Sequence, residues 1–128
     1  MADMAAPRTA CVLVVEDEYF LASDLSALLA EEGFSVIGPH GSLFGAVKAI
    51  TEQRPDIALL DLNLQGEMSF PLMDELMARS VPIVIVSGYD GQALPERYEG
   101  CTRVAKPYAR ADILGAIGKA LVGTGAPS

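Results

Sequence analysis

The stretch Asp56-Ile57-Ala58-Leu59-Leu60-Asp61-Leu62-Asn63 decides how the rest of the chain is organised. Its four consecutive apolar residues, 57–60, predict a short strand buried on both faces of a sheet, as in parallel sheets. Asp61 follows where this buried strand meets a loop. A carboxylate at such a position is costly unless another group pairs with it or coordinates it. We therefore expect the surrounding chain to supply partners for Asp61.

The composition indicates a single acidic domain. The chain has 128 residues, of which 51% are hydrophobic, and this suits one domain with a substantial core. With 9 basic and 17 acidic residues it has a net charge of −8, which argues against nucleic-acid binding because few cations would neutralise phosphates. Cys11 and Cys101 lie outside any Cys/His cluster and are expected to be buried free thiols. The chain has no signal-like segment and no membrane-length apolar run, so we expect a cytoplasmic protein without membrane contact.

Apolar runs and helical periods alternate along the chain. The turn signals at 38–41 and 65–67 predict a strand break and a loop. The segment 90–100 has room for a short helix at most, because it contains glycine and proline. The predicted strands are 10–15, 34–37, 57–61, 81–86 and 101–105, and the predicted long helices are 19–32, 42–53, 69–79 and 109–121.

This alternation predicts an α/β fold. Repeated strand–helix units imply right-handed crossovers and a doubly wound, five-stranded parallel sheet in the order 2-1-3-4-5, with about five helices on its two faces. In the third helix, Leu72, Met73, Leu76 and Met77 would face the sheet. We expect this domain to span 9–122, after an N-terminal extension, 1–8, and before a flexible tail, 123–128.

Polar groups follow four of the predicted strands. The first strand ends on Glu16 and Asp17, the third on Asp61, the fourth on Ser87 and the fifth on Lys106. The carboxyl ends of parallel strands share one edge, where ligands bind in such sheets. Three carboxylates brought together need a cation, and oxygen ligands favour Mg²⁺. Asp61 could then accept a phosphoryl group as an acyl phosphate, with Lys106 and Ser87 contacting the phosphoryl oxygens.

The chain resembles the receiver domains of two-component response regulators over about residues 9–121, a flavodoxin-like fold. The motifs that carry the resemblance are Glu16-Asp17, Asp61, Ser87 and Lys106-Pro107, each after a predicted strand. The resemblance implies a stand-alone phosphoacceptor that takes phosphate from a histidine kinase or histidine phosphotransfer protein. It would signal to a downstream protein by contact, without an output domain, as a monomer or weak dimer.

The resemblance also assigns roles to individual residues. Asp61 would be the phosphoacceptor, Ser87 the switch hydroxyl and Lys106 the phosphate-pairing lysine. Glu16, Asp17, Asp61 and the backbone carbonyl of Asn63 would hold Mg²⁺. The bond between Lys106 and Pro107 is expected to be cis.

Two residues depart from the commonest receiver pattern: Glu16, where receivers often have a first aspartate, and Arg103. Arg103 stands three residues before the lysine, where many receivers have an aromatic residue that turns inward on activation. Ser87-Gly88-Tyr89 is similar to the Thr-Gly-Tyr of a subgroup of single-domain receivers, and Tyr89 could cover the phosphoryl group. We therefore hypothesise that the stretch 88–100 carries more of the conformational change than residue 103.

The first helix is the expected docking element for the phosphodonor. In receivers, kinases and phosphotransfer domains dock near this helix and the loop after the fifth strand. Tyr19, Phe20, Ala22 and Leu25 are candidates for this contact, although helical spacing places several of them in the core.

Two other functions compete with this interpretation. A small phosphatase with an aspartyl nucleophile would commonly use a second acid two residues later, and here that residue is Asn63. A flavodoxin-like binding module would need a phosphate-binding loop after the first strand, where Glu16, Asp17 and Glu18 would repel a phosphate.

Overall fold

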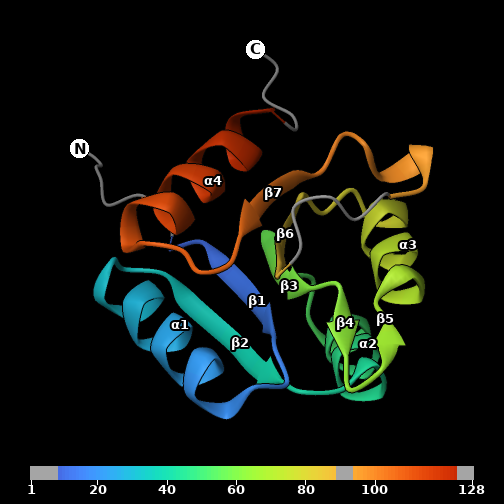
Figure 1. Ribbon diagram of the computed structural model, residues 1–128, viewed down its shortest axis with the longest axis horizontal. Coiled ribbons are helices and arrows are strands. Elements are labelled where there is room, and N and C mark those ends of the chain that lie inside the picture. The colour runs from blue at the N-terminus through green and yellow to red at the C-terminus, as the bar shows by residue number, and fades with distance from the viewer. Residues whose placement is uncertain (1–8, 89–93, 124–128) are drawn as a thin grey trace.

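A central parallel sheet organises the fold, which the computed structural model describes for residues 9–88 and 94–123. The parallel strands are β1 (Cys11–Val15), β2 (Ser35–His40), β3 (Ile57–Asp61), β6 (Ile83–Ser87) and β7 (Thr102–Ala105). They lie in the order β2-β1-β3-β6-β7 (Figure 1). Numbered along the chain, this is the predicted order 2-1-3-4-5, so the doubly wound sheet is confirmed.

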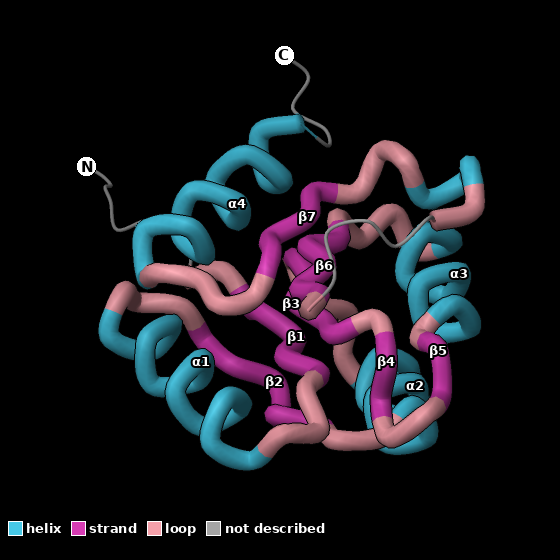
Figure 2. The backbone as a smooth tube through the Cα atoms, viewed as in Figure 1, coloured by secondary structure: helices cyan, strands magenta, loops and turns pink. Residues whose placement is uncertain are grey.

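Helices cover both faces of this sheet. They are α1 (Tyr19–Glu31), α2 (Leu43–Glu52), α3 (Phe70–Ala78), α4 (Arg110–Gly123) and the short 3₁₀ helix η1 (Glu96–Tyr98). The helices α1 and α4 lie on one face and α2 and α3 on the other (Figure 2). The described residues thus contain four α-helices and one short 3₁₀ helix, close to the predicted count of about five helices. Pro95 and Gly100 enclose a stretch too short for a further α-helix.

The core has two halves, one on each side of the sheet. Within β3, residues 57–60 are at most 1% exposed, which confirms the predicted doubly buried strand. Alternate strand residues face opposite helices, as the pleat of a strand requires. Leu13, Ala58, Leu60 and Ile85 pack on the side of α2 and α3, while Val12, Val14, Leu59 and Val84 pack on the side of α1 and α4.

One side chain of α3 lies away from the core. Leu72, Met73 and Leu76 are fully buried, as predicted. The prediction that Met77 also faces the sheet is wrong, because this side chain is 42% exposed. Met77 lies one step round the helix from Leu76, beyond the stripe that the sheet covers.

The second strand is longer than predicted. It continues past residue 37 to His40, which pairs with Val15 of β1 after a shift in register. Gly38 has a φ of 98°, a conformation that favours glycine. A Cβ at this position would lie 2.7 Å from the His40 main-chain nitrogen and 3.0 Å from the Val14 carbonyl oxygen. Gly38 therefore permits the close approach that brings His40 to the carboxyl edge of the sheet.

The loop predicted at 65–67 is part of a small hairpin. The strand β4 (Asn63–Leu64) pairs antiparallel with β5 (Glu67–Met68). Between them, Gln65 and Gly66 have φ values of 53° and 89°, and positive values at both positions suit a two-residue hairpin turn. The side-chain oxygen of Asn63 accepts a hydrogen bond from the Gly66 N–H at 2.8 Å. The sequence does not predict this hairpin, because two-residue strands carry no recognisable period.

The structure also bears on two expectations from composition. Cys11 and Cys101 are free thiols, but both are half-buried rather than buried. Burial raises the pKa of the Cys101 thiol. Within residues 9–88 and 94–123, every helix is too short or too polar to cross a membrane. The expected extension 1–8 lies outside the described residues, as does most of the expected tail.

Replacing Gly38 by alanine should destabilise the fold more than the same change at Gly33. Both residues have positive φ, 98° and 93°, so each alanine would incur the left-handed penalty of about 1–2 kcal/mol. Only at Gly38 would the new Cβ also collide with main-chain atoms, since Gly33 has nothing within 4 Å. We expect urea denaturation to give a free energy of unfolding at least about 1 kcal/mol lower for Gly38→Ala than for Gly33→Ala. Equal losses would show that β2 moves aside at little cost.

Candidate functional site

Three carboxylates meet at the carboxyl edge of the sheet. Each of Glu16, Asp17 and Asp61 offers one oxygen, and these oxygens all lie within 4.8 Å of one another. The sheet brings them together because β1 and β3 are parallel neighbours, with Val15 opposite Leu60. Glu16 is only 4% exposed. An all-oxygen cluster of this kind could hold a hard cation.

Lys106 reaches the same cluster from the end of β7, the edge strand of the sheet. Its ammonium donates to Asp61 Oδ2 at 2.7 Å and lies 3.2 Å from Glu16 Oε1. The lysine follows β7 directly, and its main-chain N–H donates to the Ser87 carbonyl at 2.8 Å. The peptide bond between Lys106 and Pro107 is cis, the geometry that the resemblance implies.

The cluster shifts two pKa values. Burial raises the pKa of Glu16, although the Glu18 N–H and the Lys106 ammonium oppose this shift. Burial also disfavours the charged form of Lys106, but its hydrogen bond to Asp61 and its attraction to Asp61 and Glu16 outweigh burial and raise its pKa. Lys106 is therefore protonated at neutral pH. With all groups ionised, three carboxylates and one ammonium give −3 + 1 = −2, an excess that a divalent cation would balance.

Main-chain groups hold the acidic side chains in place. The Glu18 N–H donates to Glu16 Oε2 at 3.0 Å, and the Glu16 N–H donates to the His40 carbonyl at 2.9 Å. The Gln65 N–H, in the turn of the hairpin, donates to Asp17 Oδ2 at 2.8 Å. The ends of β1 and β2 and the hairpin therefore converge on this cluster (Figure 1). Sequence reasoning misses His40 and Gln65, because both act through the main chain.

The sheet also brings Ser87 to this edge, but not every predicted residue comes with it. Ser87 is 4% exposed and lies beside Ala105 at the end of β6, next to the residue paired with Asp61. Asn63 follows Asp61 in β4, and its N–H donates to Asp61 Oδ1 at 3.1 Å. Arg103 lies exposed on β7 opposite Ile85, away from the strand ends. Tyr89 lies outside the described residues.

Ser69 is a site neighbour that sequence reasoning misses. It is fully buried at the start of α3, and its hydroxyl donates to the main-chain carbonyl of Asp61 at 2.5 Å. The signal available in the sequence, a serine two residues before Pro71, predicts only a helix start.

A second unpredicted cluster joins η1 to α3. The hydroxyl of Tyr98, a residue that is 0% exposed, donates to Asp74 Oδ1 at 2.6 Å. Arg97 donates to the same carboxylate at 3.2 Å, and its guanidinium lies 4.5 Å from the centre of the Tyr98 ring. Phe70 stacks on the Tyr98 ring with centroids 5.2 Å apart. The segment that follows β6 is thus fastened to α3 at Tyr98.

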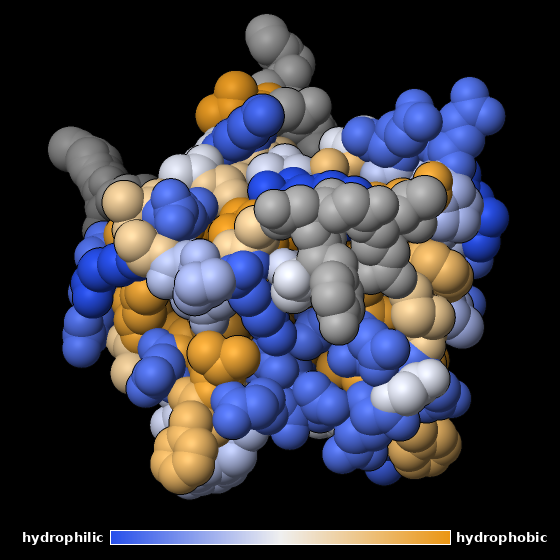
Figure 3. All heavy atoms as spheres, viewed as in Figure 1, coloured by the Kyte–Doolittle hydropathy of each residue, from blue (hydrophilic) through white to orange (hydrophobic). Residues whose placement is uncertain are grey.

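The first helix presents two of the four predicted docking residues to solvent. Tyr19 and Phe20 are 75% and 72% exposed, and their rings pack edge to face. Ala22 and Leu25 are buried in the core, as helical spacing predicts for several of the four candidates, so only Tyr19 and Phe20 remain available to a partner. They lie on the face of α1 that covers the sheet. In the view of Figure 3, largely hydrophilic residues cover the lower centre of the molecule.

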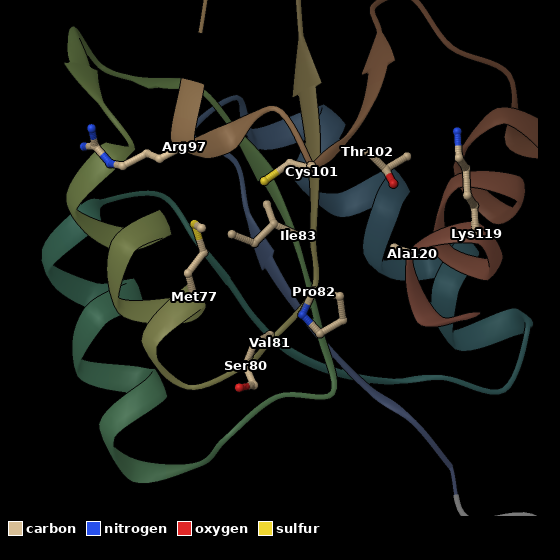
Figure 4. A pocket seen from close by; sticks show the side chains of 11 residues that line it. Met77, Ser80, Val81, Pro82, Ile83, Arg97, Cys101, Thr102, Lys119 and Ala120 are labelled. Carbon is tan, nitrogen blue, oxygen red and sulfur yellow. The ribbon is translucent and has the colours of Figure 1, made fainter. Parts of the chain in front are cut away.

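A cavity of about 600 Å³ lies elsewhere in the molecule. Its lining includes Pro82, Ile83, Cys101 and Thr102, from the beginning of β6 and β7, with Lys119 and Ala120 of α4 (Figure 4). These are the amino ends of the strands, opposite the edge that carries the acidic cluster. The cavity therefore takes no part in the chemistry of that cluster.

Together these features define a class of protein: a parallel α/β domain with an acidic cluster and a lysine at the carboxyl ends of its strands. The sequence matches the response regulator receiver domain over residues 12–117, and the chain belongs to this family. It is accordingly a receiver domain of two-component signalling. The strand order confirms the predicted fold, and the sequence match confirms the predicted family.

Relatives of known role support the family and show how far the match extends. The transcriptional regulatory protein PdtaR of Mycobacterium tuberculosis (strain CDC 1551 / Oshkosh) is 30% identical over 120 residues, covering 91% of this chain and 58% of PdtaR. The phyllosphere-induced regulator PhyR of Methylorubrum extorquens is 32% identical over 123 residues, covering 93% of this chain and 46% of PhyR. The chain thus spans about half the length of these curated relatives.

Solved structures agree in fold. The solution structure of SdrG from Sphingomonas melonis Fr1 superimposes with a TM-score of 0.78 at 29% identity, over 89% of this chain and 98% of SdrG. The receiver domain of PhyR from Erythrobacter litoralis has a TM-score of 0.82 at 23% identity, over 94% of this chain and 95% of that domain. At that lower identity, the second likeness concerns the fold alone.

Replacing Asp74 by asparagine should lower stability at neutral pH and have little effect in acid. The hydrogen bond from Tyr98, and then that from Arg97, lower the pKa of Asp74 below its ordinary 3.8. A carboxyl group with a depressed folded-state pKa contributes stability above its unfolded-state pKa and loses that contribution as the pH falls through its folded-state pKa. We expect the urea midpoints of wild type and Asp74→Asn to differ near about pH 7. The difference should shrink as the pH falls below 3.8 and vanish once Asp74 is protonated in the folded state.

The matched control for this experiment is Asp24→Asn, which neutralises an exposed carboxylate of α1. It should leave the difference between wild type and variant small throughout the same pH range. A constant loss for Asp74→Asn from neutral to acid pH would contradict an electrostatic origin of the effect.

Proposed function

We propose that this domain accepts a phosphoryl group from a phosphohistidine onto Asp61 and passes the signal on by protein contacts. The observation that carries the proposal is the ion pair of 2.7 Å between Lys106 and Asp61 beside Glu16 and Asp17. A nucleophilic carboxylate, a fixed cation and a cluster of further carboxylates are the parts that phosphoryl transfer to an aspartate requires.

Mg²⁺ is the cofactor that fits this cluster. The donors of Glu16, Asp17 and Asp61 are all carboxylate oxygens, which suit a hard cation bound through few protein ligands. The backbone carbonyl of Asn63 would complete the protein's share of the ligands. When bound, Mg²⁺ would supply positive charge that neutralises the phosphoryl oxygens. The two pairs fixed by main-chain bonds, Glu16 to Glu18 and Asp17 to Gln65, would keep the ligand oxygens oriented.

Two other residues, at the ends of β6 and β7, would contact the phosphoryl group. Lys106 already contacts Asp61 Oδ2 and, because its pKa is raised, would keep its positive charge beside the phosphoryl oxygens. Ser87, buried at the end of β6, would donate its hydroxyl to one of them. The link through the Lys106 N–H to the Ser87 carbonyl would hold these two residues in a common frame.

The two alternative functions fit less well. A phosphatase would need a proton donor near Asp61, but Asn63 carries an amide and binds the hairpin turn through its side-chain oxygen. A flavodoxin-like module would place a ligand phosphate at the end of β1, where Glu16 and Asp17 carry negative charge. Durable phosphorylation of Asp61 therefore accounts for more of the site than either alternative.

The switch in this domain would use the segment after β6 rather than residue 103. Arg103 is exposed on β7, so it does not occupy the inward position of an aromatic switch residue. Tyr98, which ends η1, is fully buried, and it anchors the segment to α3 through Asp74. A conformational change that begins at Ser87 would then extend no further than Tyr98. The part of the hypothesis that concerns 89–93 lies outside the described residues.

Asp61 should become labelled by acetyl phosphate in the presence of Mg²⁺. We expect one phosphoryl group per chain by intact mass spectrometry, no label on Asp61→Asn, and no label when a chelator removes the metal. Lys106→Ala should slow labelling by about tenfold or more, because it removes the charge that lies beside Asp61. Many turnovers of donor per chain, without a stable adduct, would instead favour the phosphatase.

The exposed pair Tyr19 and Phe20 should matter for a protein donor and not for a small one. A double change to alanine removes two rings that lie free on the surface of α1, so the fold and the site should persist. We expect transfer from a phosphorylated histidine phosphotransfer protein to slow by about tenfold or more, with labelling by acetyl phosphate unchanged.

Phe44→Ala is the control for this docking experiment, because Phe44 is 81% exposed and lies on α2, across the sheet. It should leave both reactions unaffected. Equal slowing by Phe44→Ala and by the double variant would show that apolar exposure in general, and not the surface of α1, governs docking.

A further inference from the structure

We propose that Ser69 is a positioning residue for Asp61, which it holds through the aspartate's main chain. The inference rests on the proposed function, because it concerns how the phosphoacceptor is oriented. Its basis is the 2.5 Å hydrogen bond from the Ser69 hydroxyl to the Asp61 carbonyl oxygen, formed by a serine that is 0% exposed.

The serine closes the excursion that leads away from the site. Asp61 ends β3 and Ser69 precedes α3, with the hairpin of 62–68 between them. The Ser69 main chain contributes a second bond, from its N–H to the Leu62 carbonyl at 2.7 Å. Ser69 thus fastens both Asp61 and the next residue at the base of the hairpin. The turn of the same hairpin holds Asp17 through the Gln65 N–H, and the Asn63 N–H of the hairpin donates to Asp61. The hairpin therefore contacts two of the three carboxylates.

A comparison within the chain shows that Ser69 does not act as an ordinary helix cap. Ser42 stands in the equivalent place before α2, has φ and ψ of −136° and 155°, and accepts a hydrogen bond from the Gly45 N–H at 3.1 Å. That is the usual capping role of serine. Ser69 has φ and ψ of −82° and 10° and makes no side-chain capping bond. Its hydroxyl is directed to Asp61 instead, at the expense of the first turn of α3.

The consequence concerns the orientation of the reacting carboxylate. The Asp61 side chain contacts Lys106 at 2.7 Å and the Asn63 N–H at 3.1 Å, so its oxygens have little freedom once the main chain is fixed. Without the Ser69 hydroxyl, the Asp61 carbonyl would lose this donor and the peptide unit could rotate to find another. A displacement of about 1 Å at a reacting group can slow a reaction by about a hundredfold. Ser69 would therefore affect the rate of phosphorylation more than the binding of the donor.

The experiment compares three variants at Ser69 with a matched serine elsewhere. Ser69→Ala removes the hydroxyl, Ser69→Cys fills the same space with a weak donor, and Ser69→Thr retains the hydroxyl. Ser42→Ala removes a serine hydroxyl before α2, where the hydroxyl accepts a hydrogen bond from the Gly45 N–H. The rate of Asp61 labelling is measured as a function of acetyl phosphate concentration at saturating Mg²⁺, on protein shown to be folded by circular dichroism.

We expect Ser69→Ala and Ser69→Cys to lower the maximal labelling rate by about tenfold, with the half-saturating donor concentration changed less than about twofold. Ser69→Thr should restore most of the rate, and Ser42→Ala should leave it unchanged. The ¹³C chemical shift of the Asp61 carbonyl should change in Ser69→Ala and Ser69→Cys but not in Ser42→Ala. A general loss of stability would not change this chemical shift in the folded protein.

The outcomes separate this inference from the function on which it rests. A wild-type protein that acetyl phosphate does not label at Asp61 would overturn both. A labelled wild type with Ser69→Cys reacting at the wild-type rate would overturn the positioning role alone, because only the volume of the side chain would then matter. If the threonine does not fit its buried place, the comparison of Cys with Ser still decides the question.

Discussion

The structure depends on keeping three carboxylates together at the edge of a buried sheet. Glu16, Asp17 and Asp61 repel one another, and burial of Glu16 adds a desolvation cost. The Lys106 ammonium offsets part of this cost through ion pairs of 2.7 Å and 3.2 Å. The remaining negative charge makes the site a place for a cation. The apolar strands behind it, at most 1% exposed at residues 12–15 of β1 and 57–60 of β3, hold the charges in place.

Groups from outside the motifs that carry the family resemblance complete the site. His40 and Gln65 supply a carbonyl and an N–H to the first two acids, and Ser69 fastens the third through its backbone. These groups come from β2, the hairpin and the start of α3, which are all close to the acidic cluster. The site is therefore a property of the whole carboxyl edge. It cannot be reduced to five reactive side chains.

The opposite flank of the domain is arranged differently from the commonest receiver pattern. Arg103 is exposed on β7, whereas Tyr98 is buried, donates a hydrogen bond to Asp74 of α3 and stacks on Phe70. α3 is therefore linked at two places, to Asp61 through Ser69 at its start and to η1 through Asp74.

The sequence by itself determines the sheet, its order and the acids at its edge, because doubly buried strands and strand-end carboxylates leave clear patterns around residues 57–61. It does not determine the hairpin of 62–68, the continuation of β2 to His40 or the exposure of Met77. Positive φ values, changes of register and the position of a helix face against the sheet carry no periodic signal. Only the tertiary structure brings Ser69 to Asp61 and Tyr98 to Asp74, because hydrogen bonds between distant residues form only after the chain has packed.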